Sequence, residues 1–520
     1  MNWPLLVFFL SFISMFLLRI PIGFGMMMSA ILYFAVSTSP IATIDQVAMQ
    51  FLTNLNASFV LIAVPLFVFM AEIMNTSKVT NTIFHFASGL VGKRRGAMAQ
   101  VNIVNSIIFS GMTGSAIADA SGPGNMEMKA MKDDGYDDGF TCAVTAASAT
   151  MGPIIPPSIP MVFYSMLSGA SIGALFMGGV IPGLMLGLFM MPYTAWVSVK
   201  RNYPKGHAYP FREFILVALK ATPALMTIVI LLGGIYTGVV TPTEAGALAA
   251  TWSLLIAVFF YRAFGWKDMW EVLKNTVRTT GNLSFLVGAA YAFGYIVAIE
   301  HIPQLVAHWM LSLTTDKNMM LFIVNIVFLA LGMFLDTMAI TLVFVPIVLP
   351  VMNAMHVDLV HFGVVIVLNM MIGLSTPPYG MLLFVVSGLT GTKLKDIIKE
   401  MIPFILLFIV VLFLITYIPD LVLWLADGGA FPAVRRIADL GVPVLALPVV
   451  GVPDELLGQA VKAFVRVDGL VIDFNTRKPV PKANIAVLLP RITSQQWADQ
   501  GYPEAAVYAY GVADSQGKFT

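Results

Sequence analysis

The stretch GPIIPPSIP (residues 152–160) interrupts an apolar segment long enough to cross a bilayer, and GLSTPPYGM (residues 373–381) does the same at the matching place in the other half of the chain. Proline removes a backbone donor and breaks the hydrogen bonds of a helix. Irregular backbone is tolerated at membrane depth only where protein buries it or where it lines a cavity. The repeated pair of breaks therefore predicts a transporter with a binding site near the middle of the membrane.

The composition indicates a membrane protein. Of the 520 residues, 58% are hydrophobic and only 11% are charged, more apolar surface than a soluble core of ordinary size can bury. We expect an all-α polytopic membrane protein in a lipid bilayer. The formal net charge of +1 gives no reason to expect nucleic acid as a partner. The lone Cys142 excludes an intrachain disulfide, and we expect it to be a packing residue.

Apolar segments of membrane-crossing length follow one another along the chain. They run near residues 3–18, 21–36, 57–75, 138–166, 172–197, 214–236, 245–264, 281–299, 360–391 and 402–425. The first has no small-residue cleavage site, so we expect a retained helix and not a removable signal. Two further segments, 101–125 and 319–350, need a different interpretation.

The basic residues predict the orientation of these segments. We place Arg19 on the cytoplasmic side. Further basic residues then fall on that side in clusters at residues 93–95, 200–212, 262–278 and 393–399. This positive-inside pattern holds only if 101–125 enters from the cytoplasm and returns there, and if 319–350 does the same from outside. Both segments are therefore predicted to be re-entrant helical hairpins.

The predicted hairpins divide at polar turns. Residues 101–125 divide at SGMTGS (residues 110–115) into arms of about ten residues, which reach about 15 Å, half of a roughly 30 Å hydrocarbon core. Residues 319–350 divide at LGMFLDTMA (residues 331–339). Each half of the chain thus has helices, a hairpin and a Pro-broken helix. We expect inverted repeats, near 1–197 and 214–425, in a transmembrane transporter domain spanning 1–426.

The breaks and hairpin turns offer groups that coordinate ions. Unwound carbonyls and hydroxyls ligate Na⁺, and the N-terminal ends of half-helices present amides to a carboxylate. The Na⁺ candidates are Ser110, Gly111, Thr113, Gly114, Ser115, Gly152, Pro153, Gly332, Asp336, Thr337, Gly373, Thr376 and Pro377. The substrate candidates are Ser115, Asp119, Pro156, Pro157, Ser158, Ser375 and Pro378. The alternative is that Gly and Ser merely let helices pack closely.

Three acidic residues need separate treatment, because ionisable groups in membrane segments are costly and usually functional. For Asp119, an ion site and a structural cap on a half-helix both remain open. Asp336 is expected to bind an ion or to orient its hairpin. Glu244, in TPTEAG (residues 241–246), is expected to stabilise a helix start capped by Thr241 or Thr243.

Several motifs together resemble the large membrane subunit of TRAP (tripartite ATP-independent periplasmic) transporters over about residues 1–425. They are RIPIGF (19–24), VPLFVFMAEIM (64–74), FSGMTGSAIADASGPG (109–124), GPIIPPSIPMVFY (152–164), GGVIPGL (178–184), TPTEAGA (241–247), FLDTMA (334–339) and LSTPPYGMLLF (374–384). The acid-rich KDDGYDD (132–138) departs from the family pattern and is expected to leave transport unaffected.

The resemblance implies an Na⁺-driven elevator transporter for an organic acid in the bacterial inner membrane. It implies no enzymatic activity and no cofactor, with Na⁺ as the coupling ion. Its expected partners are a small membrane subunit of about four helices and a periplasmic substrate-binding protein. The acid can be a dicarboxylate, a sugar acid or a keto acid, because no basic residue stands out inside a membrane segment as a carboxylate clamp.

Residues 427–520 differ in composition and are expected to form a soluble tail, β-rich or α/β, on the periplasmic side. VVGVPDELLGQAVKAFV (449–465) resembles a C-terminal segment of acyl-adenylate-forming ligases. Residues 468–490 and 511–520 resemble the opening strands of a carboxypeptidase-regulatory-like β-sandwich. Neither resemblance is complete, so the tail is interpreted as an incomplete or mosaic segment without activity, with a periplasmic β appendage as the alternative.

Other functions compete with this hypothesis. A stand-alone ion-coupled carboxylate carrier of the same inverted-repeat type needs no partners. An intramembrane aspartyl protease needs two carboxylates close enough to share a proton, but neither Asp119 nor Asp336 lies in a YD or GxGD motif. A passive channel would not need paired hairpins that enter from opposite sides.

Overall fold

The computed structural model describes residues 3–18, 20–37, 43–57, 60–77, 79–206, 209–237, 239–262 and 264–426, and four short strands beyond them. Contacts divide the chain into two compact units, Met1–Ala430 and Phe431–Thr520. In the second unit β1 (Phe464–Val467) pairs with β2 (Leu470–Asp473), and β3 (Asn484–Leu488) pairs with β4 (Val507–Val512), both antiparallel. Most of the ligase-like stretch lies outside the described residues, and both tail resemblances and the side of the membrane stay predictions.

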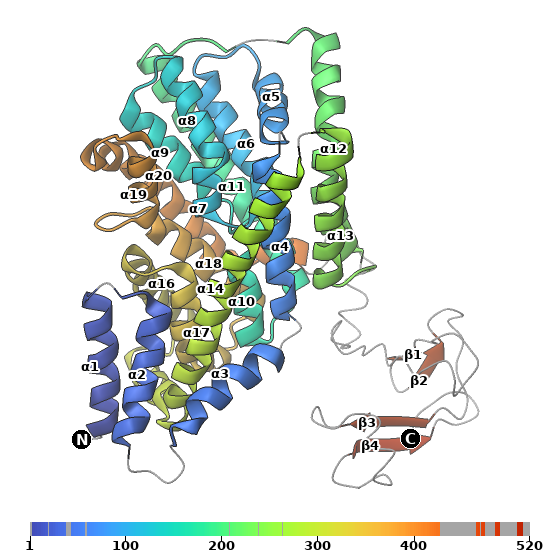
Figure 1. The fold of residues 1–520 in the computed structure, drawn as a ribbon. Coiled ribbons are helices and arrows are strands. Elements are labelled where there is room, and N and C mark those ends of the chain that lie inside the picture. Colours follow the sequence, from blue (N-terminus) through green and yellow to red (C-terminus); the bar gives the residue numbers. More distant parts are fainter. Residues whose placement is uncertain are drawn as a thin grey trace. The chain divides into compact units, whose positions relative to one another are not determined.

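Every named secondary-structure element among the described residues of the first unit is a helix (Figure 1). Its first half contains α1 (Trp3–Leu17), α2 (Ile22–Val36), α3 (Asp45–Ala57), α4 (Val60–Thr76), α5 (Val79–Val91), α6 (Ala97–Thr113), α7 (Ala116–Ser121), α8 (Pro123–Asp133), α9 (Asp138–Ala149), α10 (Ile159–Ser168) and α11 (Ile172–Lys200). Its second half contains α12 (Phe211–Tyr236), α13 (Pro242–Leu255), the π-helix η1 (Ile256–Phe260), α14 (Trp266–Ile299), α15 (Ile302–Leu313), α16 (Lys317–Phe334), α17 (Thr337–Ala354), α18 (Leu359–Leu374), α19 (Met381–Thr390), α20 (Leu394–Tyr417) and α21 (Asp420–Ala426).

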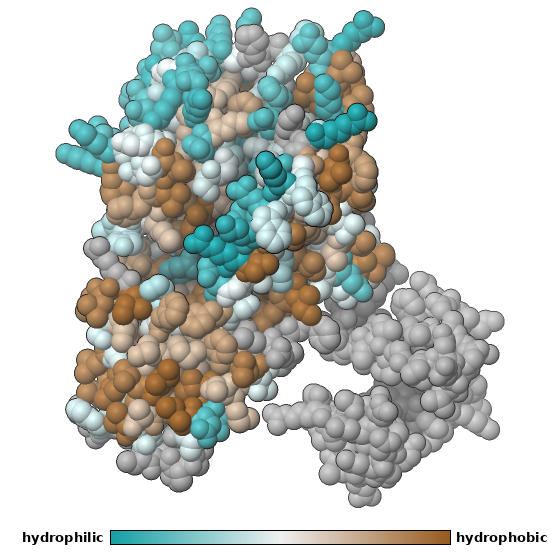
Figure 2. Space-filling view, viewed as in Figure 1, coloured by the Kyte–Doolittle hydropathy of each residue, from teal (hydrophilic) through white to brown (hydrophobic). Residues whose placement is uncertain are grey.

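Among the described residues, seven helices are long and apolar enough to cross a membrane: α11, α12, α13 with η1, α14, α16, α17 and α20. An eighth span results if α4 and α5, which meet at a bend of 74°, are taken as one. Apolar residues cover much of the face in Figure 2, whereas hydrophilic residues gather at the end where α8 lies. The unit is an all-α polytopic membrane protein.

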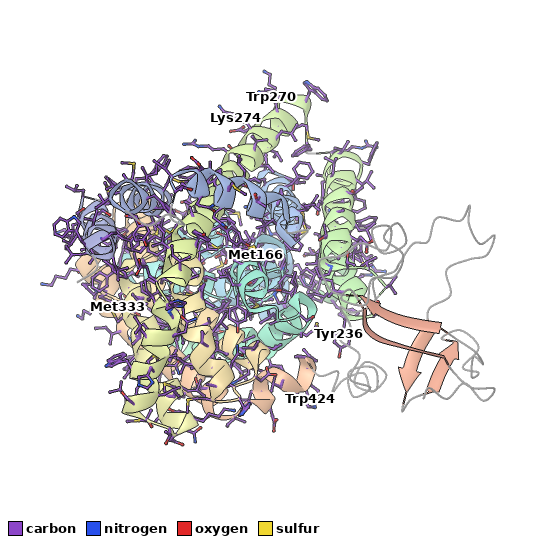
Figure 3. The ribbon with its side chains drawn as sticks, turned by 90° about the horizontal axis from the view of Figure 1, so that it is seen from below. Met166, Tyr236, Trp270, Lys274, Met333 and Trp424 are labelled. Carbon is purple, nitrogen blue, oxygen red and sulfur yellow. The ribbon has the colours of Figure 1, made fainter. Side chains whose placement is uncertain are left out.

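Several predicted helix bounds are wrong. The helix expected at 281–299 begins at Trp266, so Lys267 and Lys274 lie on α14 and not in a loop. Lys, Glu and Leu are good helix formers, so this polar stretch continues the helix to 34 residues, about 51 Å and longer than a roughly 30 Å hydrocarbon core. Figure 3 shows Trp270 and Lys274 on its projecting end.

Other differences have similar causes. The helix expected at 402–425 is two helices, α20 and α21, because Pro419 cannot continue α20. Helices α3, α5 and α15 were not expected, because their Asn, Thr, His and Gln residues interrupt the apolar runs that predict membrane helices. Arg19, on which the predicted orientation depends, lies outside the described residues.

The predicted hairpin segments do break at their polar turns, but the first has longer arms than expected. Helix α6 continues through Ser110 and ends only at Gly114, whose φ of +64° is left-handed, which suits glycine. The returning arm is itself divided into α7 and α8 at Gly122. In the second segment α16 and α17 are separated at Leu335 and Asp336. Re-entry of both from opposite sides of the membrane stays a prediction.

The two halves of the helical unit pack in matching patterns. Helix α6 packs on α9 as α16 packs on α18, and α9 packs on α20 as α18 packs on α11. The first returning arm, α7 and α8, contacts α19, and the second, α17, contacts α10. One constant offset in residue number relates Gly111, Ser115, Gly152, Pro156 and Pro157 to Gly332, Asp336, Gly373, Pro377 and Pro378. This matching supports an internal repeat, whose bounds stay predictions.

Candidate functional site

The first helix break lies between α9 and α10 and is closed to the surface. Every residue from Gly152 to Ser158 is buried. The Ser158 hydroxyl caps α10 by accepting a hydrogen bond from the Met161 N–H over 3.3 Å, and it donates to the Pro153 carbonyl. Ser158 therefore joins the start of α10 to the non-helical backbone before it.

The turn between α6 and α7 lies directly against this break. A Cβ added to Gly114 would overlap the Pro157 carbonyl oxygen, and one added to Gly152 would stand 3.3 Å from the Ser115 carbonyl carbon. Ser115 caps α7, since its hydroxyl accepts from the Ala118 N–H over 3.4 Å. The glycines thus let two non-helical stretches of backbone touch, as the sequence predicts for this pair of elements.

The second helix break, between α18 and α19, is met by α16. A Cβ added to Gly373 would lie 2.6 Å from the Gly332 Cα, so the two helices touch backbone to backbone. Ser375 is fully buried, but Pro378 at the far side of this break is exposed. Because Pro378 is exposed, the second break opens to the surface, whereas the first does not. The Pro156–Pro157 and Pro377–Pro378 peptide bonds are both cis.

The predicted hydroxyl ligands are engaged with their own helices. Ser110 and Thr376 donate to carbonyl oxygens one turn earlier, over 2.5 and 2.6 Å. Thr113 and Ser375 form similar bonds, over 3.3 and 3.0 Å. A hydroxyl that donates its proton keeps lone pairs that can face a cation. The geometry is therefore compatible with coordination and with close packing alone.

Three other candidates have distinct positions. Gly111 faces α12, because its added Cβ would lie 2.8 Å from the Ile228 side chain. Asp336 caps α17, accepting from the Met338 N–H over 3.1 Å, and its expected roles in orienting the hairpin and in binding an ion both stay predictions. Buried Thr337 is the first residue of α17.

Asp119 does not have the structural role considered for it. Ser115 caps α7 and Gly122 precedes α8, so the expectation that Asp119 caps a half-helix is wrong. It lies in the first turn of α7 with 2% of its surface exposed, and neither carboxylate oxygen has a hydrogen-bond partner among the described residues. Its electrostatic neighbours are Ser106 and Glu127, and neither belongs to a break.

Glu127 was missed by sequence reasoning, as were Asn102 and Asn105, which lie fully buried on α6. A signal existed, because Asn102, Asn105 and Ser106 recur at spacings of three and four residues, which place them on one helix face. Glu244 behaves as expected: it forms a capping box with Thr241, whose N–H donates to the Glu244 carboxylate over 2.7 Å.

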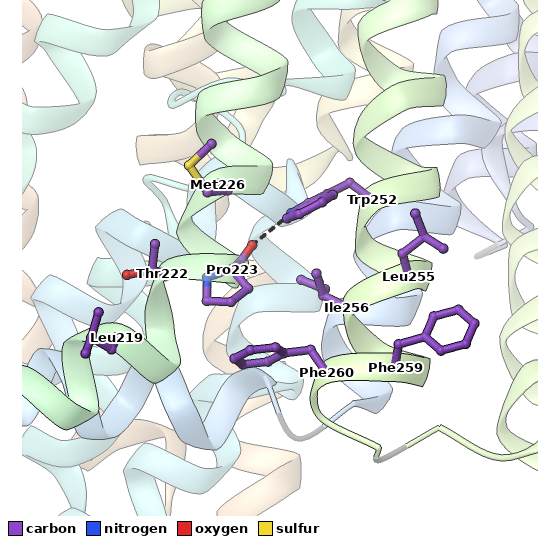
Figure 4. Close-up of a pocket in the computed structure, with 9 residues that line it drawn as sticks. All are labelled: Leu219, Thr222, Pro223, Met226, Trp252, Leu255, Ile256, Phe259 and Phe260. Carbon is purple, nitrogen blue, oxygen red and sulfur yellow. Dashed lines mark hydrogen bonds between the residues drawn. The ribbon is translucent and has the colours of Figure 1, made fainter.

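An apolar groove of about 520 Å³ lies away from both breaks, between α12 and α13 with η1 (Figure 4). Met226 and Phe259 help to line it, and the Trp252 indole N–H donates to the Pro223 carbonyl across it over 2.9 Å. Its lining is mostly apolar and contains no charged side chain, so the groove is a poor site for a carboxylate or a cation.

The architecture defines the class of protein. A polytopic helical unit with two discontinuous helices, each touched at its break by a helix end from another segment, has the form of a secondary transporter. Residues 9–421 match the family of the tripartite ATP-independent periplasmic transporter, DctM component. The chain belongs to this family, and it is a multi-pass protein of the inner membrane.

Relatives with assigned substrates support this membership. The chain is 38% identical over 407 residues to the sialic acid TRAP transporter large permease protein SiaM of Vibrio cholerae, covering 78% of this chain and 95% of that one. It is 37% identical over 361 residues to the C4-dicarboxylate large permease protein DctM of Pseudomonas aeruginosa, covering 69% and 84%. It is 35% identical over 403 residues to the sialic acid permease SiaT of Haemophilus influenzae, covering 78% and 65%. Each of these relatives is named as a permease.

Proposed function

We propose that this chain imports an organic acid across the inner membrane together with Na⁺, and that both bind at the two helix breaks. The observation that carries the proposal is that a helix end from another segment touches the backbone at each break. Gly114 meets Pro157 at the first break, and the last turns of α16 and α18 meet at Gly332 and Gly373 beside the second. Such contacts leave carbonyl and amide groups for a ligand in a region that excludes most water.

The C-terminal ends of two helices meet at each break. Helices α6 and α9 both end at the first break, and α16 and α18 both end at the second. The last carbonyls of a helix lack intrahelical partners, and its C-terminus carries about half a negative charge. Two such ends side by side favour a cation, which supports placing Na⁺ there.

The opposite helix ends favour the substrate carboxylate. Helices α10 and α19 begin at the breaks, and α17 begins at the neighbouring turn. Their dipoles, and the first-turn amides that the caps Ser158 and Asp336 leave free, attract anions. Ser158 at the start of α10 and Ser375 before α19 add hydroxyl groups. The relatives carry sialic acid, C4-dicarboxylates and 2,3-diketo-L-gulonate, all organic acids, which supports that substrate class without selecting a member.

Two partners complete the proposed transporter: a small membrane subunit and a periplasmic substrate-binding protein. The matched family is described as tripartite and periplasmic, which supports this composition. The separate binding protein would deliver the acid to the outer face. It would also supply affinity for the carboxylate, because the described membrane segments lack an evident basic side chain to bind it.

Uptake by purified protein in liposomes tests the proposal. With the two cognate partners and an inward Na⁺ gradient, radiolabelled sialic acid and C4-dicarboxylates are offered in parallel, with K⁺ replacing Na⁺ as the control. We expect Na⁺-dependent uptake of one acid and none from the chain alone. Uptake that is indifferent to Na⁺, or full activity without partners, would refute the coupling or the partner assignment respectively.

Variants at the breaks test the site separately. Asp336→Ala, and Ser110→Ala with Ser115→Ala, should lower Na⁺-dependent uptake more than they lower the amount of protein in the membrane, because each removes oxygen from a desolvated cation site. Wild-type uptake with unchanged Na⁺ dependence in both variants would exclude these residues as ligands.

A further inference from the structure

A buried acidic cluster lies inside the first hairpin segment, beside the first break. It contains Asp119 on α7 and Glu127 on α8, which are 2% and 1% exposed, and Asn105 on α6, which is fully buried. Asn105 donates a hydrogen bond from its amide nitrogen to one Glu127 oxygen, and the two carboxyl groups interact electrostatically. Three successive helices therefore converge on one polar cluster.

The cluster has acceptor oxygens without donors. Both oxygens of Asp119, the second oxygen of Glu127 and the amide oxygen of Asn105 have no hydrogen-bond partner among the described residues. No ion pair of the described residues involves either carboxylate. Burial of ionised carboxylates without a counter-charge is strongly unfavourable, so these groups are neutralised either by a bound cation or by protons.

The neighbouring donors are already engaged elsewhere. The Asn102 amide donates to the Thr145 hydroxyl over 2.8 Å. Ser148 donates to the Asn102 amide oxygen over 2.7 Å, and Ser106 donates to Ser148 over 3.0 Å. This chain of bonds joins α6 to α9 and leaves the cluster's oxygens unsatisfied. The unmet requirement is therefore for a ligand that accepts electron pairs from oxygen.

The second half of the chain shows that packing does not require these acids. The offset that relates Gly111 to Gly332 relates Asp119 to Ile340 and Glu127 to Val348. Ile340 and Val348 are buried in the second hairpin segment, at 0% and 8% exposure. An equivalent helix pair thus forms with apolar side chains at these positions, so the carboxylates serve a purpose that packing alone does not explain.

We propose that Asp119, Glu127 and Asn105 bind a hard, oxygen-ligated metal cation inside the first hairpin segment, at a site beside the helix break and separate from it. Carboxylate and amide oxygens are the ligands that Na⁺, Mg²⁺ and Ca²⁺ prefer, whereas softer metals take nitrogen and sulfur. Because its ligands come from α6, α7 and α8, the ion ties these helices into one body. This assignment goes beyond the proposed function and does not depend on transport.

Thermal stability of the full purified chain in detergent tests the site. The apparent Tm is measured in choline chloride and with NaCl, MgCl₂ or CaCl₂ added at constant ionic strength. We expect one metal to raise the Tm of the wild type in a concentration-dependent way. Asp119→Asn and Glu127→Gln should lose the part of that increment that does not depend on the helix breaks, and they should be at least as stable as the wild type in choline, since each removes a buried charge. Asp133→Asn, on an exposed acid of α8, is the matched control and should keep it.

The remaining outcomes distinguish metal binding at this cluster from ion binding at the break and from protonation of the two carboxylates. The Ser110→Ala, Ser115→Ala double variant should retain the increment that Glu127→Gln loses, whatever its effect on uptake. Equal increments in the wild type and in both carboxamide variants would overturn the proposal. So would a wild type that responds to pH in choline but to none of the three metals, because the neutralising species would then be a proton. Should the carboxamide variants fail to fold, binding of radiolabelled Na⁺ or Ca²⁺ to the wild type and to the serine double variant decides: no bound ion overturns the site.

Discussion

Gly373→Ala probes the backbone contact at the second break. The added Cβ would lie 2.6 Å from the Gly332 Cα and 2.7 Å from its carbonyl carbon, where ordinary contacts begin at 3.4 Å. Both obstacles are backbone, so α16 and α18 must move apart by roughly 0.8 Å, and overpacking of this kind costs roughly 1–3 kcal/mol. Alanine regains about 1 kcal/mol of helix propensity, which leaves a net loss of up to roughly 2 kcal/mol.

Gly388→Ala is the matched control, because nothing lies within 4 Å of a Cβ added at that position in α19. The same chemical change should there raise stability by roughly 0.5–1 kcal/mol through helix propensity alone. The two variants should therefore shift the apparent Tm in detergent in opposite directions. Only Gly373→Ala should reduce Na⁺-dependent uptake in liposomes, since it separates the helix ends that meet at the break.

The reasoning fails if Gly373→Ala matches the wild type in both Tm and Na⁺-dependent uptake. That result would show that α16 and α18 do not touch at Gly332 and Gly373, or that their contact has no part in ion binding. Loss of stability with normal uptake of the folded fraction would retain the contact and exclude the break from the site.

Four further predictions concern other parts of the chain. The Nη1 of Arg201 donates to Asp137 over 2.9 Å, and its Nη2 donates to both carboxylate oxygens of Glu400 over 2.8 and 2.7 Å. Arg201→Ala should therefore lower stability by about 2 kcal/mol, read as a Tm shift against a Lys200→Ala control. The hydrogen bond from Tyr203 lowers the pKa of Asp137, and Arg201 lowers it further. The stability that ionised Asp137 contributes is therefore fully present above the ordinary carboxyl pKa and is lost as pH falls through the lowered pKa. Asp137→Asn should flatten the acid limb of a Tm–pH profile. Thr241→Ala should cost about 1 kcal/mol by removing the capping box of α13, and an unchanged Tm would refute that role. A chain truncated near Asp427 should insert and transport like the full chain, whereas a marked loss of Tm or uptake would show that the tail docks on the helical unit.

The class of protein and the position of both breaks were predictable from local chemistry. Proline removes a helix donor wherever it stands, so Pro153 and Pro377 end helical bonding without regard to their neighbours. The glycine at residue 114 and the Leu335–Asp336 pair mark the two turns for similar local reasons. The start of α14 at Trp266 was not predicted, because apolar content cannot indicate how far a helix extends beyond the hydrocarbon core.

The sequence by itself determined that this chain is a helical membrane protein with a repeated pair of interrupted segments, because hydropathy and proline act within a few residues. Only the tertiary structure decided which interruptions touch, since the contacts of Gly114 with Pro157 and of Gly332 with Gly373 join helices distant in sequence. It also decided that Glu127, in a polar stretch of α8, faces the interior beside Asp119. The physical reason is that burial belongs to the assembly of helices: a carboxylate becomes costly, and therefore informative, only when neighbouring helices exclude its water.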